Sequence, residues 1–88
     1  MAKTPEAKVK EKVTGILKRY KVYYFFPVTG GFGASGVPDI VGCANGKFFG
    51  IECKAGANKP TALQQHHLNS IELQSGYALL VNESNIDD

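Results

Sequence analysis

Asp39 and Glu52 are the residues of this sequence whose types and spacing are best suited to holding a metal ion, and Lys54 would place its ammonium group beside them. They flank Asn45-Gly46, a dipeptide typical of a two-residue hairpin turn, because both turn positions need a positive φ. If these two residues form the turn, Asp39 lies opposite Glu52, and Lys54 shares their face of the sheet. Directly opposed carboxylates destabilise a sheet. Mg²⁺ or Mn²⁺, which prefer oxygen ligands, would relieve that repulsion.

The same spacing has a plainer interpretation. Asp39 and Glu52 would then be an exposed acidic pair at the end of a hairpin, with Lys54 as their salt-bridge partner. The hairpin register is common to both interpretations, so the two differ only in whether the carboxylates converge on a common ion.

Glu6 and Gln64 are two further polar residues that can face this pair. Thr4-Pro5 predicts a helix start, and Glu6 lies at the edge of the apolar stripe that follows, so it faces the domain, whereas Glu11 faces water. Glu6 is either an acid favoured by the helix dipole or a carboxylate aimed at the metal. Gln64 either completes a capping box with Thr61 or turns its side chain toward the end of the hairpin.

Apolar periodicity and turn residues predict the order helix, strand, strand, strand, helix, strand. Both faces of the hairpin carry apolar residues, so helices should cover both faces of a mixed four-stranded sheet, with the last strand parallel to its neighbour. The expected elements are a helix from Pro5 with a stripe of Val9, Val13, Ile16, Leu17 and Tyr20, a strand Val22–Val28, the hairpin, a helix from Thr61 to about Leu73–Ser75 stopped by Gly76, and a strand Tyr77–Val81.

Residues 29–37 contain four glycines and directly precede Asp39. A Walker-type phosphate loop is excluded, because no Gly-Lys-Ser/Thr follows and the next element is a strand. The segment is either a mobile loop that lets a nucleic-acid backbone approach the site, or a long turn whose glycines relieve backbone strain.

The length of 88 residues predicts a single domain, residues 1–88, in which the acidic stretch 83–88 is poorly ordered. The chain lacks a membrane-spanning run and the apolar segment of a signal peptide, so we expect a soluble, cytoplasmic protein. Cys43 and Cys53 should lie on opposite hairpin faces as reduced core residues. No Cys/His spacing predicts a zinc site, and His66 and His67 are assigned no role.

The net charge of +2 is unevenly distributed. Residues 1–21 hold seven basic residues against two acidic ones, which gives +5. A basic segment of this kind is consistent with a partner that has a phosphate backbone, and it is equally consistent with a solvated helix face.

Pro38-Asp39, twelve intervening residues and then Glu52-Cys53-Lys54, set on an αβββαβ order, resemble the PD-(D/E)xK nuclease superfamily. Within it the chain is similar to the VRR-NUC family, most of all to the small stand-alone members found in phages. The resemblance runs nearly end to end, through five pieces in the right order: Pro5-Glu6, residues 36–40, residues 49–54, residues 59–64 and Gly76.

The resemblance implies a restriction-endonuclease-like α/β core and a role for each matched residue. Asp39, Glu52 and the backbone carbonyl of Cys53 would bind Mg²⁺ or Mn²⁺, with Glu6 as a further ligand, directly or through water. Lys54 would orient the attacking water and stabilise developing charge. Gln64 matches the glutamine that opens the second helix of the family.

These roles predict a metal-dependent endodeoxyribonuclease that leaves a 5′-phosphate and a 3′-hydroxyl. The small size of the domain and its resemblance to archaeal junction-resolving enzymes lead us to expect a homodimer acting on branched, flap or Holliday-junction DNA, with no membrane partner and no small-molecule cofactor. One alternative is a nucleic-acid-binding module that does not cleave. A hydrolase of small phosphoesters is a third interpretation, but the sequence shows no apolar substrate pocket.

Overall fold

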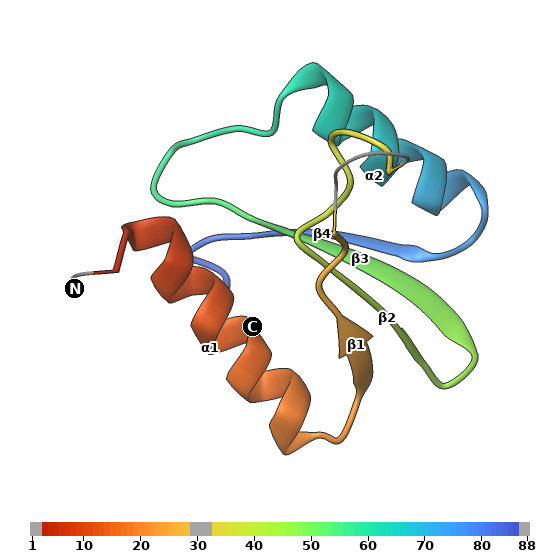
Figure 1. Ribbon diagram of the computed structural model, residues 1–88, viewed down its shortest axis with the longest axis horizontal. Helices are drawn as coiled ribbons and strands as arrows, with labels where there is room; N and C mark the ends of the chain where they lie inside the picture. The colour runs from red at the N-terminus through yellow and green to blue at the C-terminus, as the bar shows by residue number, and fades with distance from the viewer. Residues whose placement is uncertain (1–2, 29–32, 87–88) are drawn as a thin grey trace.

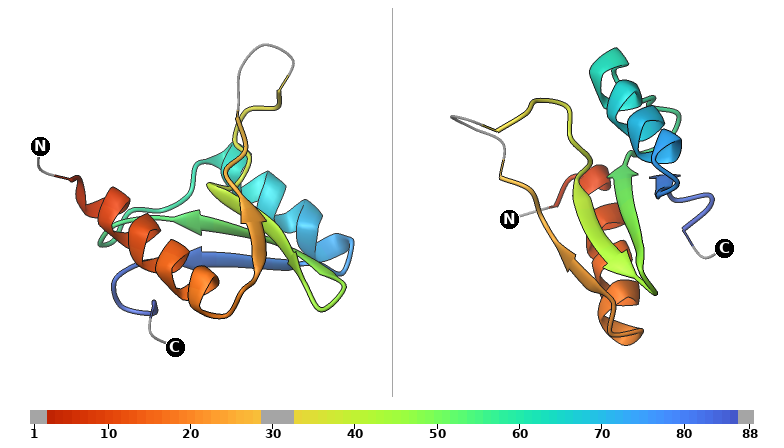
Figure 2. Two further views of the ribbon diagram at one scale, coloured as in Figure 1. Left: turned by 60° about the horizontal axis from the view of Figure 1, so that its bottom comes forward. Right: turned by 90° about the vertical axis from the view of Figure 1, so that its right-hand side faces the viewer.

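Two helices pack on opposite faces of a four-stranded sheet in the computed structural model, which describes residues 3–28 and 33–86 (Figures 1 and 2). The elements are α1 (Pro5–Arg19), β1 (Tyr23–Phe25), β2 (Ile40–Ala44), β3 (Lys47–Cys53), α2 (Ala62–Leu73) and β4 (Tyr77–Val81). The strands lie in the order β1-β2-β3-β4, with β3 and β4 parallel and the other pairs antiparallel. The predicted element order and mixed sheet are therefore confirmed.

The β2–β3 hairpin has the register that its turn predicts. Asn45 and Gly46 have φ values of 53° and 79°, as both positions of the turn require. Ala44 pairs with Lys47, and Ile40 pairs with Ile51. One step beyond that last pair, the chain places Asp39 opposite Glu52.

The hydrophobic core lies between α1 and one face of the sheet. Val9 and Val13 of α1 are buried against the hairpin, and Thr4 caps the helix by accepting a hydrogen bond from Ala7 N. Tyr20, expected to continue the apolar stripe, is 70% exposed, because it is the C-cap residue and no longer follows the helical spacing. The buried members of the core are Val9, Val13, Ile40, Phe49, Ile51, Cys53 and Ile86.

Residues 83–86, expected from the sequence to be poorly ordered, contact the domain through Ile86 and Glu83. The Ile86 side chain is buried in the core, and the Glu83 carboxylate accepts a hydrogen bond of 2.8 Å from Gly56 N. This bond lowers the pKa of Glu83. The segment is acidic in composition, but one apolar side chain is enough to hold it against the domain. Residues 87–88 lie outside the described part of the chain.

Two further predictions differ from the structure near β1 and the hairpin turn. β1 covers Tyr23–Phe25 rather than residues 22–28, because its partner β2 begins at Ile40 and Pro27 cannot donate a ladder hydrogen bond. Cys43 is exposed rather than in the core, because its end of the hairpin is incompletely covered, as the exposed cross-strand partner Phe48 also shows. Cys43 and Cys53 are free thiols, as expected.

α2 ends earlier than the longest prediction, at Leu73, and Gln74 is its C-cap. The residue with a positive φ after the helix is Ser75, at 67°. Gly76 is instead needed because a larger residue would clash: a Cβ there would lie 2.9 Å from the carbonyl oxygen of Phe48 and 2.8 Å from Ile71 Cγ2. Gly76 therefore follows the end of α2, as predicted, but the reason for a glycine there is close packing rather than a positive φ.

No helix among the described residues is both long enough and apolar enough to cross a membrane.

Gly50 of β3 lets α2 and the chain before β2 approach the sheet. A Cβ at this position would lie 2.6 Å from Ile71 Cδ1 and 2.9 Å from Pro38 Cγ. We expect Gly50→Ala to cost about 1–3 kcal/mol through overpacking and to lower the melting temperature by roughly 4–8 °C per kcal/mol. Gly15→Ala is the control, because no heavy atom outside the local helix lies within 4 Å of its added Cβ. A thermal melt in which both variants behave alike would contradict this account of Gly50.

Candidate metal centre

Asp39 is fixed at the point where β2 begins. Pro38 before it is buried, and its ring lies over Gly50. Asp39 Oδ2 accepts a hydrogen bond of 2.9 Å from the backbone N–H of Cys53. This bond ties the carboxylate to the strand that carries Glu52, so Asp39 is positioned by the backbone of its neighbour strand.

Glu52 is the penultimate residue of β3 and is 1% exposed. Neither of its carboxylate oxygens has a hydrogen-bond partner among the described residues. A buried carboxylate without partners is costly, since burial removes hydration and nothing replaces it. A proton shared with the neighbouring Asp39 carboxylate, or a bound cation, would satisfy this group.

Glu6 joins this pair from the first turn of α1. One carboxylate oxygen each of Glu6, Asp39 and Glu52 lie within 4.8 Å of one another. The sequence left Glu6 open between a dipole acid and a carboxylate facing the metal, and the structure brings it to the other two. Three converging carboxylates offer the hard oxygen ligands that Mg²⁺ and Mn²⁺ prefer. We call these three residues the acid cluster.

The environment of Glu52 raises its pKa to about 8. Burial is the main cause, followed by the adjacent Asp39 carboxyl, and the charge of Glu6 acts in the same direction. When both carboxyls are ionised neither has a proton to donate, whereas a protonated Glu52 can donate to Asp39. Without a cation, the cluster therefore favours the protonated form of Glu52.

Cys53 separates Glu52 from Lys54 and points into the core. Burial, aided by the charges of Asp39 and Glu52, raises the pKa of its thiol to about 12. The thiol therefore stays neutral and is unsuited to binding a metal as thiolate. The expected contribution of Cys53 through its backbone carbonyl is not affected by this result.

Lys54 is half-buried beside the acid cluster, and its charge lowers the pKa of Glu52, against the larger effects that raise it. In the described ranges it forms no ion pair, since the salt bridge found there joins Lys3 and Glu11. The plainer interpretation required an exposed acidic pair neutralised by Lys54. The burial of Glu52 contradicts that interpretation.

Gln64 is used by the N-terminus of α2. Its Oε1 accepts from Thr61 N at 2.9 Å, while Gln64 N donates to Thr61 Oγ1 at 3.2 Å. The predicted capping box is thus confirmed. The capping box uses the hydrogen-bonding capacity of the Gln64 amide oxygen. The expected role of Gln64 at the metal site remains a prediction.

His67 was given no role from the sequence, but it joins α2 to the glycine-rich segment. Its Nε2 lies 2.9 Å from the carbonyl oxygen of Ser35, the geometry of an N–H donor. The next residue, Gly36, has a φ of 76° and leaves no room for a Cβ against Leu63. Residues 29–32, on which the prediction of a mobile loop partly falls, lie outside the described residues.

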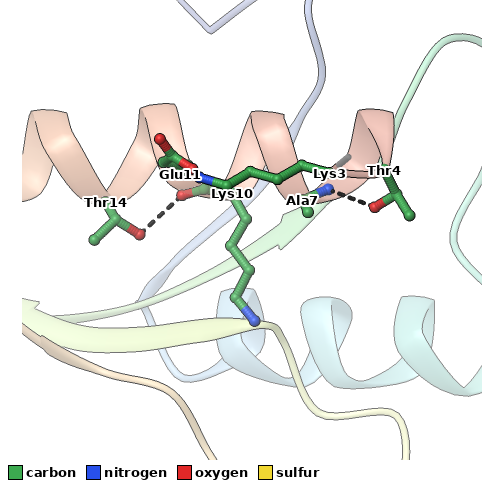
Figure 3. Close-up of polar contacts among 6 residues, drawn as sticks. All are labelled: Lys3, Thr4, Ala7, Lys10, Glu11 and Thr14. Atoms are coloured by element: carbon green, nitrogen blue, oxygen red, sulfur yellow. Dashed lines mark hydrogen bonds and ion pairs between the residues drawn. The ribbon is translucent and has the colours of Figure 1, made fainter. Parts of the chain in front are cut away.

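Lys10 was also missed as a candidate near the site. It follows Glu6 by one helical turn, and Figure 3 shows its side chain extending from α1 toward the sheet, away from the Lys3–Glu11 ion pair. Its charge opposes the rise in the pKa of the Cys53 thiol. The i, i+4 spacing from Glu6 indicates that Lys10 lies next to it on the helix. That spacing points to the site only when Glu6 is known to belong to the acid cluster.

No protein-family model matches the chain, and a search of curated proteins found no significant match. The likeness to the VRR-NUC family therefore depends on the motif residues and their order on the elements.

Proposed function

We propose that this protein is a Mg²⁺- or Mn²⁺-dependent nuclease that hydrolyses phosphodiester bonds in DNA. The observation that carries the proposal is the fully buried Glu52 carboxylate, which has no hydrogen-bond partner in the described chain and shares a 4.8 Å cluster with Asp39 and Glu6. A divalent cation satisfies this donor set, because it supplies the positive charge that three close carboxylates lack.

The residues around the cluster suit phosphoryl chemistry. A bound divalent cation would neutralise charge on the phosphate and make a coordinated water more acidic. Asp39 is held in place by the Cys53 N–H, so its carboxylate needs no reorganisation to act as a ligand. Lys54 brings an ammonium group beside the carboxylates, where it can orient a water molecule and stabilise negative charge that develops on phosphate oxygens.

The finer features of the proposal come from the motif resemblance. They are a restriction-endonuclease-like core, products with a 5′-phosphate and a 3′-hydroxyl, and a homodimer acting on branched, flap or four-way DNA. The basic N-terminal segment supports a partner with a phosphate backbone, because Lys8, Lys12 and Lys18 of α1 are exposed.

Incubation with end-labelled single-stranded, duplex, flap and four-way DNA, with and without Mg²⁺ or Mn²⁺, tests the proposal. We expect cleavage only in the presence of a divalent cation. Asp39→Asn, purified in parallel, is the control for contaminating nucleases and should give no products. DNA retention without metal-dependent cleavage, unchanged in Asp39→Asn and Lys54→Ala, would instead identify a binding module.

A further inference from the structure

An open groove of about 510 Å³ runs along α1, the helix that carries Glu6 of the acid cluster. Its first lining residue, Ala7, directly follows Glu6, and Lys10 follows one turn later. The groove and Glu6 therefore lie on the same helix, within one turn of each other. The lining residues are Ala7, Lys10, Glu11, Thr14, Gly15, Lys18 and Phe26.

Phe26 forms the side of the groove opposite α1, and 46% of its surface is exposed. The ring is held in a defined orientation, because the Tyr24 ring meets it edge to face at 5.9 Å and Lys10 Nζ lies 4.8 Å from its centroid. An aromatic side chain that is fixed in place and open to solvent can stack on a planar ligand at a small cost in conformational entropy.

The charge of the groove is positive. Lys10 and Lys18 lie two helical turns apart, about 12 Å along the axis, and neither forms an ion pair within the described part of the chain. Glu11 is the acidic residue of the lining, but Lys3 pairs with it, and the Lys10 side chain extends away from that pair (Figure 3). A chain of phosphates therefore meets two uncompensated ammonium groups along the groove.

We propose that this groove binds an unpaired, single-stranded segment of DNA beside the scissile phosphate. One base stacks on Phe26 in place of the Lys10 ammonium, which moves off the ring and contacts a neighbouring phosphate, as Lys18 does. A duplex cannot use Phe26 in this way, because its base faces are already covered by stacking. This inference rests on the proposed nuclease function, because only a nuclease would treat the bound strand as part of its substrate. It narrows that substrate to DNA with a single-stranded portion.

Equilibrium binding of a fluorescent oligothymidylate and of a matched duplex, measured by anisotropy without divalent cations, tests the groove independently of cleavage. We expect Phe26→Ala to weaken binding of the single strand about tenfold and to leave its salt dependence unchanged. Phe26→Trp should retain the affinity. Tyr77→Ala is the matched control, because Tyr77 is an aromatic residue on β4 that is 58% exposed and lies outside the groove.

Lys10→Gln should change a different quantity. We expect it to reduce the slope of log K against log salt concentration by about 0.7, the value for one lost phosphate contact on a single strand. Lys47→Gln, at the exposed hairpin turn, removes the same charge outside the groove and should leave the slope unchanged.

Either of two results would contradict the proposed role of the groove. In the first, Phe26→Ala binds the single strand as tightly as Tyr77→Ala does; in the second, Phe26→Ala weakens binding of the duplex and of the single strand equally. Failure of the nuclease proposal looks different. In that case the wild-type protein shows no metal-dependent cleavage, while its binding to the single strand still requires Phe26 and Lys10.

Discussion

Glu52→Gln is expected to abolish Mn²⁺-supported DNA cleavage while leaving the metal-free protein as stable as the wild type, or more stable. Glutamine has the shape of a protonated glutamate, so it fits the buried site without a carboxylate charge. The metal-free wild type must either keep Glu52 protonated against its ordinary pKa or accept repulsion with Asp39 and Glu6, whose oxygens lie within 4.8 Å, and glutamine avoids both. The same change deletes an anionic ligand, and a loss of about 3 kcal/mol of charge stabilisation slows the reaction at least about a hundredfold.

Glu72→Gln is the matched control, since it makes the same chemical change at an exposed position of α2 outside the acid cluster. Three measurements on each variant are sufficient: initial cleavage rate, Mn²⁺ titration by calorimetry, and the melting temperature in EDTA. Cleavage by Glu52→Gln at the wild-type rate would remove Glu52 from the proposed site. A melting temperature well below that of the wild type would mean that Glu52 serves the fold rather than a ligand.

The hairpin and its opposed acids could be predicted because the signals that set them are local. Asn45-Gly46 fixes the turn, and the alternation of side chains then puts Asp39 and Glu52 on one face at the same height. Thr4 and Thr61 likewise mark their helix starts through contacts three residues away. A register set by a two-residue turn leaves little freedom for tertiary packing to alter.

The features that the sequence did not predict depend on contacts between distant segments. Ile86 lies in an acidic segment, and only the return of the chain after β4 buries it beside α1. Cys43 has the residue type of a core position, but its exposure is decided by how far the helices cover the hairpin. The burial of Glu52 is of the same kind. Alternation predicted its face and its partner, but the complete loss of solvent contact follows from the packing of other elements over β3.

Raising the pH from about 5 to about 8 is expected to lower the melting temperature of the metal-free protein more than that of Glu52→Gln. The pKa of Glu52 is about 8 in the folded protein and near 4.5 in an unfolded chain. Between these values the unfolded chain has released the proton that the folded protein still binds, so each rise in pH favours unfolding. Below about 4.5 both states hold the proton, and above about 8 neither does, so this contribution is constant outside the interval.

Mg²⁺ should reverse this dependence, because a cation in the acid cluster favours the ionised carboxylate that high pH produces. The increase in melting temperature caused by Mg²⁺ should therefore grow as the pH rises toward 8, and it should be small at every pH in Glu52→Gln. Differential scanning fluorimetry of both proteins, with Mg²⁺ or EDTA, gives all four curves. The difference between wild type and variant cancels the contributions of ionisable groups outside the acid cluster, the two histidines included. If that difference does not change with pH in EDTA, Glu52 does not retain its proton in the fold, and the repulsion that a metal would relieve is absent.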